Sequence, residues 1–146
     1  MVLSQARLNS DSDGDGLPNA WMMQYFGHPT GTAVDKSRAT EDADGDGMSN
    51  AAEYLAGTHP RDPSSNLRIT SIKPQTNDIR VTWTTVPGKH YMLQVANAFG
   101  NPATNSFIDI SPQITGAGTN ASVTDYVDSG AFTNRSANFY RVRLSH

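Results

Sequence analysis

The chain has 146 residues, no cysteine and a formal net charge of −3. The lack of cysteine excludes disulfides and thiolate metal sites, and no apolar run approaches the length that spans a bilayer, so we expect no membrane partner. Lys and Arg form no run interleaved with aromatic residues, so we also expect no nucleic-acid partner.

The charge is divided unevenly along the chain. Residues 1–66 carry ten acidic and four basic residues, whereas residues 67–146 carry four acidic and seven basic ones. The acidic residues of the first half gather in two short loops, which indicates local metal sites rather than a generally acidic surface. We expect two domains, residues 1–63 and 64–146.

The first acidic loop reads Asp11-Ser12-Asp13-Gly14-Asp15-Gly16. A carboxylate at every second position, followed by glycine, is the pattern that surrounds Ca²⁺ with oxygens from loop positions 1, 3, 5, 7, 9 and 12. Position 12 is Met22, which offers no carboxylate, so we expect weaker binding, completed by water or by Asp35 or Glu41. The predicted metal ligands are Asp11, Asp13, Asp15, the carbonyl of Leu17, and Asn19.

A short helix is predicted directly after this loop. Pro18 suits a first helical turn, and an apolar stripe at helical spacing continues until Gly27 ends the helix. The stripe consists of Trp21, Met22, Tyr25 and Phe26. The segment from Gly27 to Thr40 contains Pro29, Gly31 and several Thr and Ser residues, so we do not expect a second helix of an EF-hand there.

The second acidic loop, Asp42-Ala43-Asp44-Gly45-Asp46-Gly47, lies 31 residues after the first and fits the calcium pattern at every position. Three carboxylates this close repel one another unless a cation lies among them. The predicted ligands are Asp42, Asp44, Asp46, the carbonyl of Met48, Asn50 and Glu53. A second helix, capped by Ser49 or Asn50, is predicted to end at Gly57.

These residues carry a resemblance to known calcium modules. The duplicated loop and helix resemble a dockerin-type module, and the DxDxDG runs are similar to thrombospondin type 3 repeats. The longer string, from DSDGDGLPNAW to DADGDGMSNAAEYLAGTHPRDP, resembles a module of secreted multidomain bacterial proteins, where it precedes a small β domain. The resemblance implies a calcium-binding module that is secreted or displayed on a bacterial cell surface.

Beyond a linker at residues 57–66, the apolar period changes from helical to two. Strands are predicted at 67–72, 79–84, 90–95, 106–111, 121–127 and 138–144, with a β-hairpin around Val86-Pro87-Gly88-Lys89. Six short strands with polar turns favour an antiparallel β-sandwich, loosely similar to fibronectin type III. The predicted fold class is therefore α+β: two calcium loop-helix motifs followed by an antiparallel sandwich.

Three functions fit this sequence. The first is a non-catalytic accessory module of a larger secreted protein, in which Ca²⁺ stabilises the first unit and orients the sandwich and neighbouring domains. The second is a carbohydrate-binding module for polysaccharide, although Trp83 and Tyr91 share strand faces with apolar residues and are predicted to be core, which leaves Phe99 and Phe107 as exposed aromatics. The third is a protein-docking module that uses the two helices. No catalytic motif is present, so no enzyme is expected.

Overall fold

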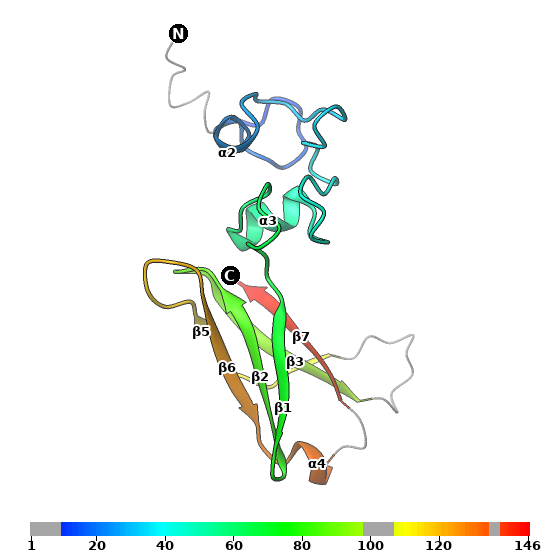
Figure 1. Cartoon of the computed structure of the whole chain (residues 1–146), viewed down its shortest axis with the longest axis vertical. Helices are drawn as coiled ribbons and strands as arrows, with labels where there is room; N and C mark the ends of the chain where they lie inside the picture. The colour runs from blue at the N-terminus through cyan, green and yellow to red at the C-terminus, as the bar shows by residue number, and fades with distance from the viewer. Residues whose placement is uncertain (1–9, 98–106, 135–137) are drawn as a thin grey trace. The chain divides into compact units, whose positions relative to one another are not determined.

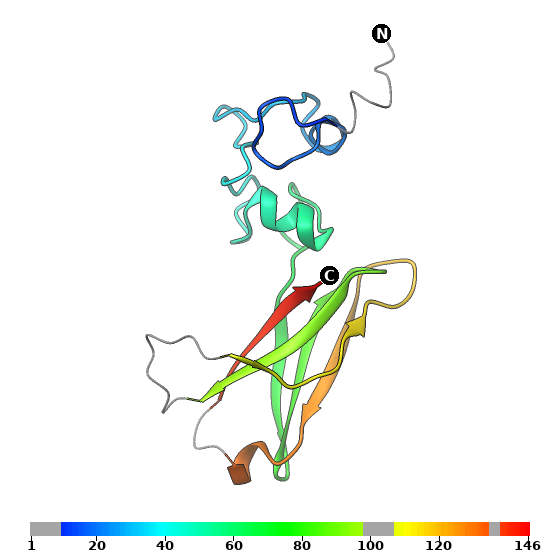
Figure 2. The same ribbon diagram turned by 180° about the vertical axis from the view of Figure 1, so that it is seen from behind.

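The computed structural model describes residues 10–97, 107–134 and 138–146. The chain divides into two compact units, Met1–Asn66 and Leu67–His146, each with its own hydrophobic core. Short helices lie in the first unit and antiparallel strands in the second (Figures 1 and 2). No described helix reaches the length and hydropathy of a bilayer span.

From residue 10 onward, the first unit contains two seven-residue helices, α2 (Asn19–Tyr25) and α3 (Asn50–Ala56), each directly after an acidic loop. The side chain of Ser49 caps α3 by accepting a hydrogen bond from the N–H of Ala52. Gly57 ends α3 in a left-handed conformation, φ 75°, and its N–H donates to the carbonyl of Glu53.

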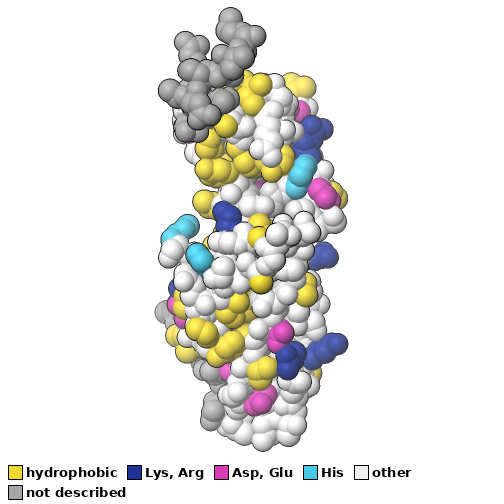
Figure 3. All heavy atoms as spheres, turned by 90° about the vertical axis from the view of Figure 1, so that its left-hand side faces the viewer, with side chains coloured by type: hydrophobic (Ala, Val, Ile, Leu, Met, Phe, Trp, Pro, Cys, Tyr) yellow, Lys and Arg dark blue, Asp and Glu magenta, His cyan; other side chains and the backbone are white. Residues whose placement is uncertain are grey.

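Residues from both repeats build the core of this unit. Its buried members are Leu17, Met22 and Ala39, with Trp21, Phe26, Ala51 and Tyr54 half-buried around them. The Trp21 ring, on α2, has its centroid 5.8 Å from that of Tyr54, on α3. The two helices therefore share one small core. On the face that Figure 3 shows, some hydrophobic side chains of the chain are visible at the surface beside charged ones.

The described residues of the second unit form two antiparallel sheets and one short helix. The first sheet has the order β1-β2-β6, while in the second β3 pairs with β7 along one edge and with β4 and β5 along the other. The elements are β1 (Ile69–Gln75), β2 (Asp78–Thr85), β3 (His90–Asn97), β4 (Ile108–Asp109), β5 (Ile114–Thr115), β6 (Ser122–Asp128), α4 (Ala131–Asn134) and β7 (Asn138–Ser145).

Side chains from both sheets form the core of this unit. Trp83 of β2 is 0 % exposed and Tyr91 of β3 is 1 % exposed, which confirms that both rings are core. Alternate residues of β7, namely Tyr140, Val142 and Leu144, pack against the same cluster. The period-two pattern thus identified the buried face of these strands.

The predicted hairpin around Val86-Pro87-Gly88-Lys89 is wrong. Strand β2 pairs with β1 and β6, whereas β3 pairs with β4, β5 and β7, so this turn carries the chain from one sheet to the other. The hydroxyl of Tyr91 accepts a hydrogen bond from the N–H of Val86, which ties the turn to the start of β3. The observed hairpin joins β1 to β2 through Thr76, whose φ is 57°.

Candidate metal centre

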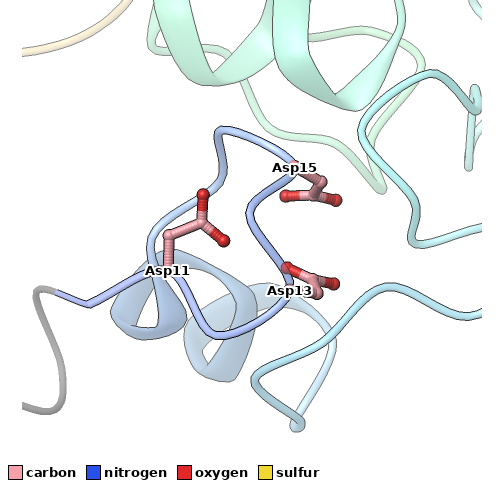
Figure 4. A group of neighbouring side chains, drawn as sticks. All are labelled: Asp11, Asp13 and Asp15. Carbon is pink, nitrogen blue, oxygen red and sulfur yellow. The ribbon is translucent and has the colours of Figure 1, made fainter.

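The first loop brings three carboxylates together. Oxygens of Asp11, Asp13 and Asp15 lie within 4.8 Å of one another. In Figure 4 the carboxylate of Asp11 points toward the other two. Asp11 and Asp13 are exposed, so water competes for any ion bound here.

Backbone N–H groups already hold several of these oxygens. Asp11 accepts hydrogen bonds from Gly14 and Gly16, each 2.8 Å long. The second oxygen of Asp13 accepts from Gly31 at 2.7 Å, and that of Asp15 accepts from Ala39 at 3.2 Å. The first loop is therefore partly closed by backbone groups that lie 18 and 24 residues after their carboxylate partners.

Three other predicted positions of the first loop are occupied by buried residues. The Leu17 side chain is 0 % exposed and packs in the core, and Met22, at position 12, is 1 % exposed in the same cluster. Asn19 is buried, and its side-chain oxygen accepts a hydrogen bond from the N–H of Ser12. The first loop thus uses position 12 for packing and position 9 for a bond within the loop.

The acids considered for completing the first loop have other partners. Asp35 lies 2.7 Å from the Nε2 atom of His28 and also accepts a hydrogen bond from the hydroxyl of Thr32. Glu41 accepts a hydrogen bond from the N–H of Arg38. Neither carboxylate belongs to the Asp11, Asp13 and Asp15 cluster.

The second loop repeats the carboxylate cluster with less exposure. Oxygens of Asp42, Asp44 and Asp46 lie within 4.8 Å of one another, and all three residues are half-buried. Asp42 accepts hydrogen bonds from Gly45 and Gly47, while Met48, at position 7, donates its N–H to Asp46. Gly45 and Gly47 have φ values of 82° and 98°, a conformation that glycine adopts readily.

Two further predicted ligands stand at the start of α3. Asn50 and Glu53 are both 0 % exposed. One oxygen of Glu53 accepts a hydrogen bond from the hydroxyl of Thr58, and the amide nitrogen of Asn50 donates to the carbonyls of Lys36 and Arg38. Each side chain therefore has one end fixed and one oxygen left over.

The buried oxygens without a hydrogen-bond partner are the decisive feature of the second loop. Among the described residues, four of its buried side-chain oxygens have no hydrogen-bond partner: Asp44 Oδ2, Asp46 Oδ2, Asn50 Oδ1 and Glu53 Oε2. A buried oxygen without a partner costs about 1–3 kcal/mol, and more if it is charged. A hard cation that prefers six to eight oxygen ligands removes this cost, so these residues fit Ca²⁺.

The electrostatics of the second loop agree with its geometry. Burial, followed by the charges of Asp44 and Asp46, raises the pKa of Glu53 to about 7. Burial also raises the pKa of Asp44. The pKa of Asp42 is instead lowered, mainly by the hydrogen bond that its carboxylate accepts from the N–H of Gly47. Without a cation the chain holds a buried carboxyl that resists ionisation beside other acids.

A known calcium-binding repeat covers this loop. Residues 42–63 match the family model of the bacterial TSP3 repeat. TSP3 repeats typically bind calcium, and the match includes Asp42, Asp44, Asp46, Asn50 and Glu53, while the first loop lies outside it. No curated protein and no solved structure matches the chain.

Sequence reasoning missed the residues that fix the predicted ligands in both loops. The hydroxyl of Thr58 donates to Glu53, and the carbonyls of Lys36 and Arg38 accept from the side chain of Asn50. The N–H groups of Gly31 and Ala39 hold Asp13 and Asp15. Most of these partners are backbone groups, which leave no signal in residue identity, so only the 31-residue spacing of the loops could have suggested that the two repeats interlock.

Proposed function

We propose that this chain is a calcium-binding, non-catalytic accessory module of a larger secreted protein. The four unpartnered buried oxygens of the TSP3 repeat carry the proposal, because burial of an ionised carboxylate costs several kcal/mol without a compensating cation. Asp42, Asp44, Asp46, Met48, Asn50 and Glu53 would hold Ca²⁺ there. Asp11, Asp13, Asp15, Leu17 and Asn19 would form the weaker first site.

In this function the ion is structural. Ca²⁺ that binds only the folded unit stabilises it by mass action, and the rigid unit would then orient the β-sandwich and the neighbouring domains of the parent protein. TSP3 repeats are extracellular-type modules, and extracellular calcium modules bind with dissociation constants of about 10⁻⁴–10⁻³ M. A value in that range supports the secreted location, and a submicromolar value contradicts it.

Isothermal titration with CaCl₂ tests the site itself. The unaltered chain should bind calcium, and Glu53→Gln should weaken the tighter binding event by roughly a hundredfold, because the number of charged ligands sets affinity in such loops. Asp62→Asn is the matched control, since it removes one acidic charge from an exposed residue of the same unit outside the loop. Equal affinity for Glu53→Gln and the unaltered chain would show that the second loop is not the site.

The carbohydrate-binding and docking alternatives gain no observation of their own. Trp83 and Tyr91 are buried, so neither ring offers a face to a sugar. Phe107 is half-buried, and the Cζ atom of the Arg141 guanidinium lies over its ring, 4.0 Å from the ring centroid. Phe99 lies outside the described residues. The aromatic rings of the two helices pack on one another, which favours a structural role.

A further inference from the structure

The segment from Lys36 to Glu41 is held by the start of α3. Asn50 donates its side-chain amide to the carbonyls of Lys36 and Arg38, both at 2.8 Å, and its own N–H to the carbonyl of Glu41 at 2.8 Å. The N–H of Ala51 donates to the carbonyl of Ala39 at 2.9 Å. Four hydrogen bonds therefore join this segment to two consecutive residues of the second repeat.

The same segment reaches back to the first loop. The carbonyl of Ala39 faces α3, and its N–H donates to Asp15. Gly31, on the same connection, donates to Asp13. The backbone of Ala39 thus stands between a carboxylate of the first loop and the helix that carries Asn50 and Glu53.

The 31-residue spacing makes Asn19 the counterpart of Asn50. The N–H of Asn19 donates to the carbonyl of Ser10, as that of Asn50 donates to the carbonyl of Glu41, and the Asn19 side chain also donates to the hydroxyls of Ser10 and Ser12. The loops differ at their carboxylates: Asp13 and Asp15 accept N–H groups from the segment after them, whereas the Oδ2 atoms of Asp44 and Asp46 lack a partner in the described chain. The segment between the loops, which the second repeat holds, therefore closes the first loop.

Packing follows the same route. Ala39 is buried beside Leu17 and Met22, and Ala51 and Tyr54 of α3 cover that cluster. The carbonyl of Tyr25, at the end of α2, accepts a hydrogen bond from Arg61. Movement of the start of α3 would therefore expose the core on which the first loop rests.

We propose that calcium bound by the second loop controls the order of the first loop through a relay from Asn50 to the backbone of Ala39 and on to Asp15. The inference rests on the proposed calcium site and adds that the two loops are one coupled device. In this relay Asn50 has two roles: its oxygen is one of the four unpartnered buried oxygens that would bind the ion, and its nitrogen fixes the segment that closes the first loop. Ala39 is a positioning residue.

Amide hydrogen exchange measured by NMR, with CaCl₂ as the only added ligand, tests the coupling. Calcium should slow exchange at Gly45 and Gly47 in the second loop and, by about five- to a hundredfold, at Leu17 and Gly31, because linked sites share a coupling free energy. In Glu53→Gln at the same calcium concentration, Leu17 and Gly31 should continue to exchange rapidly. Protection equal to that of the unaltered chain would overturn the relay.

Ala39→Pro tests the route, because it removes the N–H that Asp15 accepts but keeps the carbonyl that faces Ala51. The N–H of Glu41 donates to the carbonyl of Arg38, so Ala39 occupies the second position of a turn, where proline is favoured. Calcium should then protect Gly45 and Gly47 but not Leu17. Ala39→Gly, which keeps the N–H, is the control and should behave like the unaltered chain.

The outcomes separate the two proposals. If the unaltered chain shows neither heat of binding nor calcium-dependent protection at Gly45, the proposed function itself fails. If Ala39→Pro keeps calcium-dependent protection at Leu17, the relay fails while the calcium site stands. If Ala39→Pro does not fold, Asp15→Ala decides: linkage predicts that it weakens calcium binding at the second loop by about fivefold or more, and an unchanged affinity overturns the relay.

Discussion

Position 12 of the two loops is held by Met22 in the first and Glu53 in the second, and both side chains are buried. A buried methionine contributes packing, whereas a buried carboxylate with a single hydroxyl partner needs a cation to offset its desolvation. One substitution in a repeated pattern therefore changes a metal-dependent position into part of a hydrophobic core. This difference explains why the two loops are unequal despite their shared DxDxDG spacing.

A second charged group, His28, ties together the connection between the loops. Its Nδ1 atom lies 2.7 Å from the carbonyl oxygen of Thr30, and its Nε2 atom lies 2.7 Å from a carboxylate oxygen of Asp35. Both neighbours are acceptors, so the ring that satisfies both is the doubly protonated imidazolium. The hydrogen bond to Asp35 raises the pKa of His28, while bonds from Ser37 and His28 hold the pKa of Asp35 below its usual range.

This pair predicts a pH dependence of stability. Because the pKa of His28 is raised on folding, its contribution is fully present below its unfolded value of about 6.5 and is lost as pH rises through the folded value. As the pH rises above about 6.5, the melting temperature of the calcium-saturated first unit should therefore fall more steeply in the unaltered chain than in His28→Gln. Asp35→Asn should flatten the profile in the same way, and equal slopes in all three proteins would contradict the assignment.

At the scale of the elements, the sequence predicted local patterns better than it predicted which strands pair. The acidic positions could be predicted because the calcium loop takes its ligands from within twelve residues, and the faces of β2 and β3 could be predicted from their alternation. The partner of each strand could not, because Trp83 and Tyr91 reach the same core whether β2 and β3 share a sheet or face each other. The contacts of Gly31 and Ala39 were hidden for a related reason: their backbone N–H groups act across about twenty residues.

The turn that carries the chain between the sheets depends on Gly116. Gly116 exchanges backbone hydrogen bonds with Gly88 and Lys89, and a Cβ atom at this position would lie 2.1 Å from the carbonyl oxygen of Val86. Gly116→Ala should therefore destabilise the second unit by about 1–3 kcal/mol, as overpacking does in close-packed sites. Urea unfolding measures the loss, with Ala117→Ser at the exposed next residue as the control. A change within about 0.5 kcal/mol for Gly116→Ala would contradict the predicted clash.

At the scale of the whole molecule, the two units differ in what stabilises them. The core of the second unit includes large, fully buried side chains, among them Val81, Trp83 and Leu93. The hydrophobic cluster described in the first unit has three buried members, Leu17, Met22 and Ala39, and the unit also carries clusters of acids that repel one another. Units this small usually need a staple besides their core, and the proposed calcium ion would supply one without cysteine.

The calorimetric melt of the intact chain should therefore resolve two transitions with different responses to calcium. At a calcium concentration one hundred times the dissociation constant, mass action adds about 2.7 kcal/mol to the unit that binds, which for a domain of this size raises its midpoint by roughly 10–20 °C. EGTA should lower this transition and leave the other in place, and a fragment of residues 67–146 should melt at the temperature of the insensitive transition. One transition that moves as a whole with calcium would show instead that the two units unfold together.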